Sequence, residues 1–272
     1  MKIVFLFLFI PITFCCNGME NTYTGSTPAA NEVRSFLGIS FSDSVDFIRW
    51  WVTIADGTYH LKCNYGVGKP NTSGFWNGGK WIGLNGRVAV NGKYYSFQNG
   101  NRTLNVLEVN PGLLCLLDES KNLLTGTGAF SYVLNNNKMP SNDQVSIISK
   151  QGPLNDSMAY QGRTLCNDFS INRPGPNCYK MKWSIIFYAN AVSNTPTTYL
   201  LNRSRFDADK RGTWKIVTGK GGRVIYELIP ENGNLATYLL KLDDYIVVFT
   251  DEQDKLLVGQ KDFRYTLNRI KN

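Results

Sequence analysis

The sequence predicts an all-β protein made of two tandem, small antiparallel β-barrels of about eight strands each. An internal repeat, strands with alternating apolar and polar residues, and an aromatic-rich composition lead to this prediction. The chain has 272 residues, of which 13% are aromatic and 18% are charged. Such a mixture favours strands over long charged helices. A chain of this length can hold two domains, each with its own core.

The repeat is clearest in two phrases, "LLTGTGAFSYVLN" at 123–135 and "LLVGQKDFRYTLN" at 256–268, which lie 133 positions apart. The same offset pairs "GKW" with "GTW", so that Trp81 is matched to Trp214 and is expected in the core. An offset of 137 pairs "YTGST", from Tyr23, with "YQGRT", from Tyr160. Because the order of these landmarks is preserved, the sequence indicates a tandem duplication.

The duplication predicts one barrel over residues 20–135 and a second over 160–272. The segment 136–159 between them is rich in Asn, Ser and Pro, and is expected to be a linker.

Individual strands follow from local patterns. In "TYHLKCNY", Tyr59, Leu61, Cys63 and Tyr65 alternate with polar residues, which is typical of a half-buried strand. The "NG" in "RVAVNGKYYSF" predicts a hairpin. "LLCLLDESKNLL" predicts strand, turn and strand, with Asp118 and Glu119 in the turn. "FSYVLN" and "FRYTLN" are expected to be the last strand of each unit, whose pairing closes the barrel.

Residues 1–18 are expected to be a targeting signal, with an apolar run that is too short to span a bilayer. Three outcomes stay open: lipidation at Cys15 or Cys16, ordinary cleavage near Gly18, or an uncleaved anchor. Each of them places the mature chain outside the cytoplasm.

The remaining cysteines are Cys63, Cys115, Cys166 and Cys178. Cys166 and Cys178 flank a short polar segment with two prolines, and a disulfide is expected between them because an exported chain meets an oxidising compartment. Cys63 and Cys115 lie in apolar strands and are expected to be buried free thiols, with a second disulfide as the alternative.

No catalytic residues, cofactor or metal site are predicted. His60 is the only histidine and falls on the polar side of its strand. The cysteines are scattered, so the sequence lacks the clustered ligands of a zinc site. There is also no G-x-S-x-G elbow that would indicate a catalytic serine.

Two groups of residues are candidates for contact with a ligand or partner. Trp76 and Lys69 lie in a Gly-rich loop, and Trp76 has no match in the second repeat. The net charge is +8, and the second repeat concentrates basic residues that include Arg203, Arg205, Lys210 and Arg211. Such a patch suits anionic lipid headgroups or an acidic partner, whereas nucleic acid is not expected for an exported chain.

The repeat unit resembles the N-terminal barrel of the NlpE-like envelope lipoprotein family, which opens with Tyr-x-Gly-x-x-Pro-Cys-x-x-Cys and closes with a strand like Tyr-Thr-Leu-x-Arg. In the first repeat Tyr23, Gly25 and Pro28 match, but Ala29 and Glu32 stand where the family has cysteines. In the second, Tyr160, Gly162 and Cys166 match, and "YTLNR" ends the unit. The resemblance implies a Gram-negative envelope protein, periplasmic or lipid-anchored. The family's copper and redox roles depend on the cysteine pair, which neither repeat retains.

The sequence therefore predicts a non-catalytic envelope protein that acts as an adaptor or sensor through contacts with a protein partner. The alternative is a lipocalin-like carrier of a small apolar ligand. The abundance of Phe, Tyr, Leu and Trp in the strands favours filled barrels over hollow ones.

Overall fold

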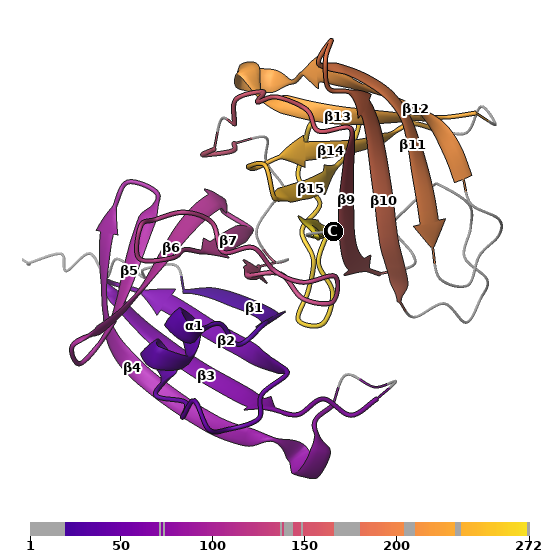
Figure 1. The fold of residues 1–272 in the computed structure, drawn as a ribbon. Helices are drawn as coiled ribbons and strands as arrows, with labels where there is room; N and C mark the ends of the chain where they lie inside the picture. Colours follow the sequence, from indigo (N-terminus) through magenta and orange to yellow (C-terminus); the bar gives the residue numbers. More distant parts are fainter. Residues whose placement is uncertain are drawn as a thin grey trace, which may run out of the picture.

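The computed structural model in Figure 1 consists of two closed antiparallel barrels that lie side by side, and it confirms the predicted fold class. The structure describes residues 20–70, 72, 74–136, 138, 144–147, 149–165, 180–203, 210–231 and 235–270, without the side chains of residues 203 and 210.

The first barrel joins its strands in chain order, and its last strand returns to the first. Its strands are β1 (Asn21–Thr27), β2 (Phe47–Ala55), β3 (Thr58–Gly66), β4 (Lys80–Asn91), β5 (Tyr94–Asn99), β6 (Arg102–Asn110), β7 (Leu113–Leu116) and β8 (Val133–Asn135). A helix, α1 (Asn31–Leu37), lies between β1 and β2, and a 3-10 turn, η1 (Trp76–Gly78), precedes β4.

The second barrel repeats this order, with its first strand paired to its second and to its last. Its strands are β9 (Ser157–Thr164), β10 (Met181–Asn190), β11 (Thr195–Arg203), β12 (Lys210–Thr218), β13 (Val224–Pro230), β14 (Thr237–Lys241), β15 (Ile246–Thr250) and β16 (Thr266–Arg269). A second 3-10 turn, η2 (Lys220–Gly222), precedes β13.

The predicted local patterns appear in the strands. Tyr59, Leu61, Cys63 and Tyr65 are all buried on one side of β3. The predicted hairpin joins β4 to β5 through a two-residue loop, with Asn91 opposite Tyr94. Gly92 opens that loop at a φ of 60°, a conformation that glycine adopts without steric cost.

The Tyr-x-Gly pair that opens each repeat contributes to barrel closure. The hydroxyl of Tyr23 donates to the carbonyl of Pro111 at 2.9 Å, and that of Tyr160 donates to the carbonyl of Asp244 at 3.0 Å. A Cβ atom on Gly25 would lie 2.7 Å from the carbonyl oxygen of Val133, so only glycine lets β1 approach β8 this closely. These residues therefore recur for a structural reason.

Large side chains fill the interior of each barrel. In the first barrel Trp50, Phe97, Leu61 and Leu104 are almost completely buried, and α1 adds Phe36 to the same core. In the second barrel, the rings of Tyr160, Trp214 and Tyr226 all contact that of Phe187. Trp183 and Phe249 form a further ring pair in the same core. Interiors packed in this way leave the barrels filled rather than hollow.

A third apolar cluster holds the two barrels together. It joins the outer faces of β6, β7 and β8 to those of β13, β14 and β15. Many of its members are related by the repeat offset, as in Leu107 and Leu240, Val109 and Leu242, Leu113 and Ile246, Cys115 and Val248, and Leu123 and Leu256. The same patch of each barrel therefore faces its counterpart, as in a two-fold symmetric dimer interface. Val145 and Ile147 of the linker pack on this cluster.

Reciprocal hydrogen bonds extend this pseudo-symmetry. The amide of Gly126 donates to Oδ1 of Asn268 at 2.9 Å, and the amide of Gly259 donates to Oδ1 of Asn135 at 3.1 Å. Both pairs are related by the repeat offset. The segments 126–131 and 259–264 meet in this region, which we call the junction.

The structure corrects one of the predicted repeat matches. Trp81 and Trp214 both lie on the fourth strand of their barrels, but Trp81 is 55% exposed whereas Trp214 is 3% exposed. The true counterpart of Gly212 is Gly86, because both glycines pack against a tyrosine ring. Gly212 packs against Tyr199, and Gly86 packs against Tyr59. The "GKW" and "GTW" phrases are thus out of register, and the prediction that Trp81 lies in the core is wrong.

Candidate functional site

The outer face of β2, β3 and β4 carries the most distinctive surface side chains of the described residues. Strand pairing aligns them in rows across the sheet, with Trp51 beside Lys62 and with Asn64 beside Trp81. We call this surface the aromatic face and define it by Arg49, Trp51, Lys62 and Trp81, together with Lys261 from the second barrel.

The aromatic face is built around two stacked tryptophans. The rings of Trp51 and Trp81 lie 5.5 Å apart with an interplanar angle of 24°. The ammonium of Lys62 lies 4.6 Å from the ring centre of Trp81, and that of Lys261 lies 5.8 Å from the ring centre of Trp51. Each ring thus has a lysine within cation–π distance, which presents exposed aromatic surface and positive charge together.

Barrel stability does not require this stack. Trp50 and Trp183 are equivalent, because their indole N–H groups donate to Thr27 and Thr164 at 2.9 and 2.8 Å. The residue that follows is Trp51 in the first repeat but Ser184 in the second. A closed barrel therefore forms without a tryptophan at this position, so the stack is a feature of the first repeat alone.

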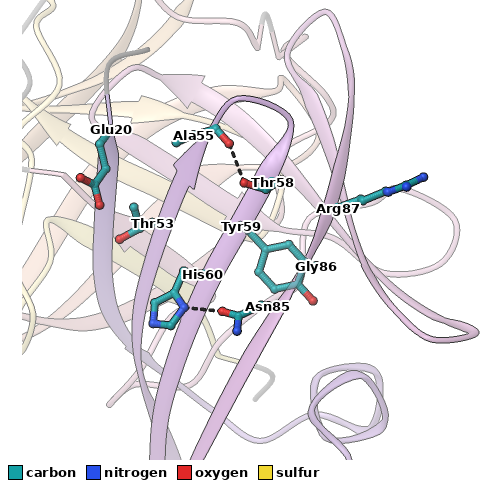
Figure 2. A pocket seen from close by; sticks show the side chains of 9 residues that line it. All are labelled: Glu20, Thr53, Ala55, Thr58, Tyr59, His60, Asn85, Gly86 and Arg87. Carbon is teal, nitrogen blue, oxygen red and sulfur yellow. Dashed lines mark hydrogen bonds between the residues drawn. The ribbon is translucent and has the colours of Figure 1, made fainter. Parts of the chain in front are cut away.

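A surface hollow of about 580 Å³ lies at one end of the same three strands. Figure 2 shows Thr53, His60 and Asn85 lying across neighbouring strands, with Glu20 and Arg87 at its borders. His60 is exposed, and its Nδ1 lies within hydrogen-bonding distance of Oδ1 of Asn85. An imidazole held by an amide does not form the nucleophile, base and carboxylate arrangement of a hydrolase.

The two predicted contact residues of the Gly-rich loop do lie together. Trp76 is 53% exposed, and the ammonium of Lys69 lies 5.6 Å from its ring centre. Of the basic residues predicted as contacts in the second repeat, Arg211 is exposed on β12. The side chains of Arg203 and Lys210, and Arg205 as a whole, lie outside the described part of the structure.

Of the cysteines considered above, two lie within the described residues and four lie outside them. Cys15, Cys16, Cys166 and Cys178 lie outside the described residues, so the lipidation and disulfide predictions stay predictions. Cys63 and Cys115 are buried free thiols, as expected, and burial raises the pKa of both well above the usual value. Such thiols are inert at neutral pH.

Within the described residues there is no cluster of three or more His, Cys, Asp or Glu side chains suited to a metal ion. The carboxylates of Asp118 and Asp251 accept backbone N–H groups within their own turns, from Asn122 and Lys255 respectively. The acidic pairs at these places in the repeat are therefore turn residues. In the same described part of the chain, no helix has the length and apolarity needed to cross a membrane.

Sequence reasoning missed the aromatic face because its central residue was assigned to the core. Trp51 and Lys62 are directly opposite in the pairing of β2 with β3, and the alternation around Cys63 already places Lys62 on the outer side. The same alternation of inward and outward residues, applied to β2 and β4, would have predicted the aromatic face.

Comparisons of the chain with protein-family models, with curated proteins and with solved structures found no match.

Proposed function

We propose that the protein is a non-catalytic component of the bacterial envelope, exported or lipid-anchored, that acts as an adaptor or sensor through contacts with a protein partner. The aromatic face is the surface that makes the contact. The single observation that carries this proposal is the stack of the exposed Trp81 on the half-buried Trp51, with Lys62 and Lys261 on the rings.

Tryptophan and cationic side chains of this kind suit a protein interface. Trp is enriched among the residues that contribute most to binding free energy, because it buries a large area with few rotatable bonds. Lysines beside the rings favour an acidic partner, which electrostatic attraction brings to the surface faster. The partner is therefore expected to present carboxylates next to an apolar surface.

The filled interiors support contact through the outside of the molecule. A carrier needs an internal space for its ligand, whereas Trp50 and Phe97 in the first barrel and Phe187 and Phe249 in the second are almost completely buried. No observation in the described residues favours the lipocalin-like carrier over the adaptor.

The local structure around the opening motif also agrees with a role that does not depend on metal. Ala29 packs against the core, and Glu32 is half-buried in the first turn of α1. The first repeat thus has no thiol at either family position. The proposed NlpE-like resemblance therefore comes without the thiol pair in this barrel.

Site-specific photo-crosslinking in envelope membranes tests the proposal. A photoreactive amino acid at position 81 is expected to give a discrete crosslinked partner, whereas the same amino acid at position 188, an exposed tyrosine on the second barrel, is not. Lys62→Glu should weaken the adduct from position 81, and the matched surface change Lys182→Glu on β10 should leave it intact. Identical adducts from positions 81 and 188, or an adduct insensitive to Lys62→Glu, would contradict the proposal.

A further inference from the structure

The junction between the barrels gathers positive charge in a buried place. Arg49 from β2, Arg163 from β9 and Arg264 from the segment before β16 all approach it. Arg49 pairs with Asp262 at 3.2 Å, and its guanidinium lies 5.9 and 5.6 Å from the ring centres of Phe47 and Phe75. The other two guanidiniums share a different neighbour.

That neighbour is Phe130, which stacks on Phe47 with ring centres 4.7 Å apart. The guanidinium carbon of Arg163 lies 5.6 Å from the ring centre of Phe130, and that of Arg264 lies 5.9 Å from it. Two like charges therefore lie at one aromatic ring, and the ring supplies only part of the stabilisation that water would give them.

Arg264 has a free pair of donors. Arg264 is only 4% exposed, and its Nη1 donates to the carbonyl of Ser131 at 3.5 Å. Its Nε and Nη2 atoms are buried and have no hydrogen-bond partner. The N–H bonds of these two atoms point the same way from one edge of the guanidinium, which is the edge that binds two oxygens of an oxyanion at once.

Two more buried groups without partners belong to residues that contact Arg264 or share its aromatic neighbour Phe130. They are the Nε of Arg163 and the hydroxyl of Ser131, the residue whose carbonyl accepts from Arg264. Burial and the charge of Arg163 lower the pKa of Arg264 to about 9, and burial lowers the pKa of Arg163. Both side chains remain charged at neutral pH, and a buried donor without an acceptor is costly enough to require an explanation.

The repeat shows that barrel closure does not need these arginines. Position 264 corresponds to Ser131 and position 163 corresponds to Ser26, so both residues in the first repeat are serines. The second repeat has an arginine at each position, and both arginines reach the same ring. The charges therefore form one asymmetric site on a pseudo-symmetric junction.

We propose that the junction binds a small free oxyanion, such as phosphate or sulfate, through the Nε–Nη2 edge of Arg264, with Arg163 as the second cationic donor. The donor atoms are shielded from solvent, so the anion enters when the segments 126–131 and 259–264 move apart, and its binding then stabilises the contact between the barrels. This inference does not depend on the aromatic face or on the proposed function.

Thermal unfolding of the full chain with added phosphate or sulfate, compared with chloride at matched ionic strength, tests the site. A ligand that binds only the folded state raises the midpoint in a saturable way. We expect such a rise with phosphate or sulfate and none with chloride, and we expect acetate to separate a carboxylate preference from a preference for tetrahedral anions.

Three variants complete the experiment. Arg264→Met and Arg163→Met should each weaken the anion response more than tenfold, whereas Arg211→Met, on the exposed surface of β12, should leave it unchanged. Isothermal titration with phosphate measures the same loss directly. Arg163 is only partly buried, so its variant remains informative if Arg264→Met fails to fold. An equal effect of chloride, or a response that survives Arg163→Met, would overturn the proposal.

Discussion

At the scale of single residues, the structure explains why certain small side chains recur in the repeat. Gly25 and Gly162 occupy equivalent places where the first strand of each barrel meets the closing strand. A Cβ atom on Gly162 would lie 2.6 Å from both the carbonyl oxygen of Thr266 and Cδ2 of Leu267. These contacts involve the backbone of a paired strand, which cannot move aside without loss of the pairing that closes the barrel.

Gly162→Ala is therefore expected to destabilise the protein by about 1–3 kcal/mol, the usual cost of forcing an extra methyl group into a packed site. Gly83→Ala is the matched control, because nothing lies within 4 Å of its Cβ position and it is also in a strand. Urea unfolding measures both. Equal effects of the two substitutions would show that the contact with the closing strand does not require glycine at position 162.

The carboxyl of Asp243 gives a prediction for pH dependence. Burial raises the pKa of this carboxyl above its usual value of 3.8. The folded state therefore binds this proton more tightly than the unfolded state, and the stability contributed by the group falls as pH rises through the raised pKa. At neutral pH the partly buried carboxylate is destabilising.

Asp243→Asn should accordingly increase stability at pH 7, since the amide oxygen still accepts from the Tyr245 N–H, which lies 2.8 Å from Oδ1 of Asp243. The advantage should shrink as pH falls toward about 4, where the wild-type carboxyl also becomes neutral. Asp56→Asn, in an exposed turn, serves as the matched Asp-to-Asn control. An advantage that grows on acidification would contradict the sign of the shift.

At the scale of elements, alternation and turn chemistry predicted much of the first barrel. The β3 pattern, the β4–β5 hairpin and the closing strands follow from side chains that respond to their immediate neighbours. The register of β4 was mistaken because two short Gly-x-Trp phrases look alike, although Trp81 faces outward and Trp214 inward. Only the pairing partners, Asn64 for Trp81 and Leu228 for Trp214, distinguish them.

The helix α1 was also missed, and its signals are local. Val33, Phe36 and Leu37 are buried at helical spacing, and Gly38 ends the helix at a φ of 72°. Seven residues are too few for helical periodicity to stand out in a chain of strands. The junction arginines were missed for a different reason, since they come from three separate elements that only the packing of the two barrels brings together.

The packed interiors of the barrels predict how the protein responds to apolar ligands. The full chain is expected to show no saturable binding of a fluorescent fatty acid, because the ring side chains occupy the space that a ligand needs. Phe97→Ala and Phe187→Ala should each cost about 3–5 kcal/mol of stability, the usual cost of removing a buried ring. One-to-one binding of the fatty acid to the unmodified chain would contradict this prediction and support the carrier hypothesis.

At the scale of the whole molecule, the two repeats form one unit. The pseudo-symmetric cluster contributes twelve buried apolar residues, and the hydrogen bonds of Asn135 and Asn268 to Gly259 and Gly126 connect the closing strands across the junction. An interface of this apolar, self-complementary kind is typical of permanent association. The linker packs on the cluster, but most of the contact lies between the barrels themselves.

The most direct test of this central claim is to cut the linker and ask whether the halves stay together. A protease site in place of residues 139–143 allows the folded full chain to be cleaved, and size-exclusion chromatography with light scattering then gives the mass. We predict that the two halves co-elute with the mass of the intact chain. We also predict that Val248→Asp in the cluster separates them after cleavage, whereas the exposed control Val90→Asp does not. Separation of the unmodified halves into two independent species on cleavage would contradict the account.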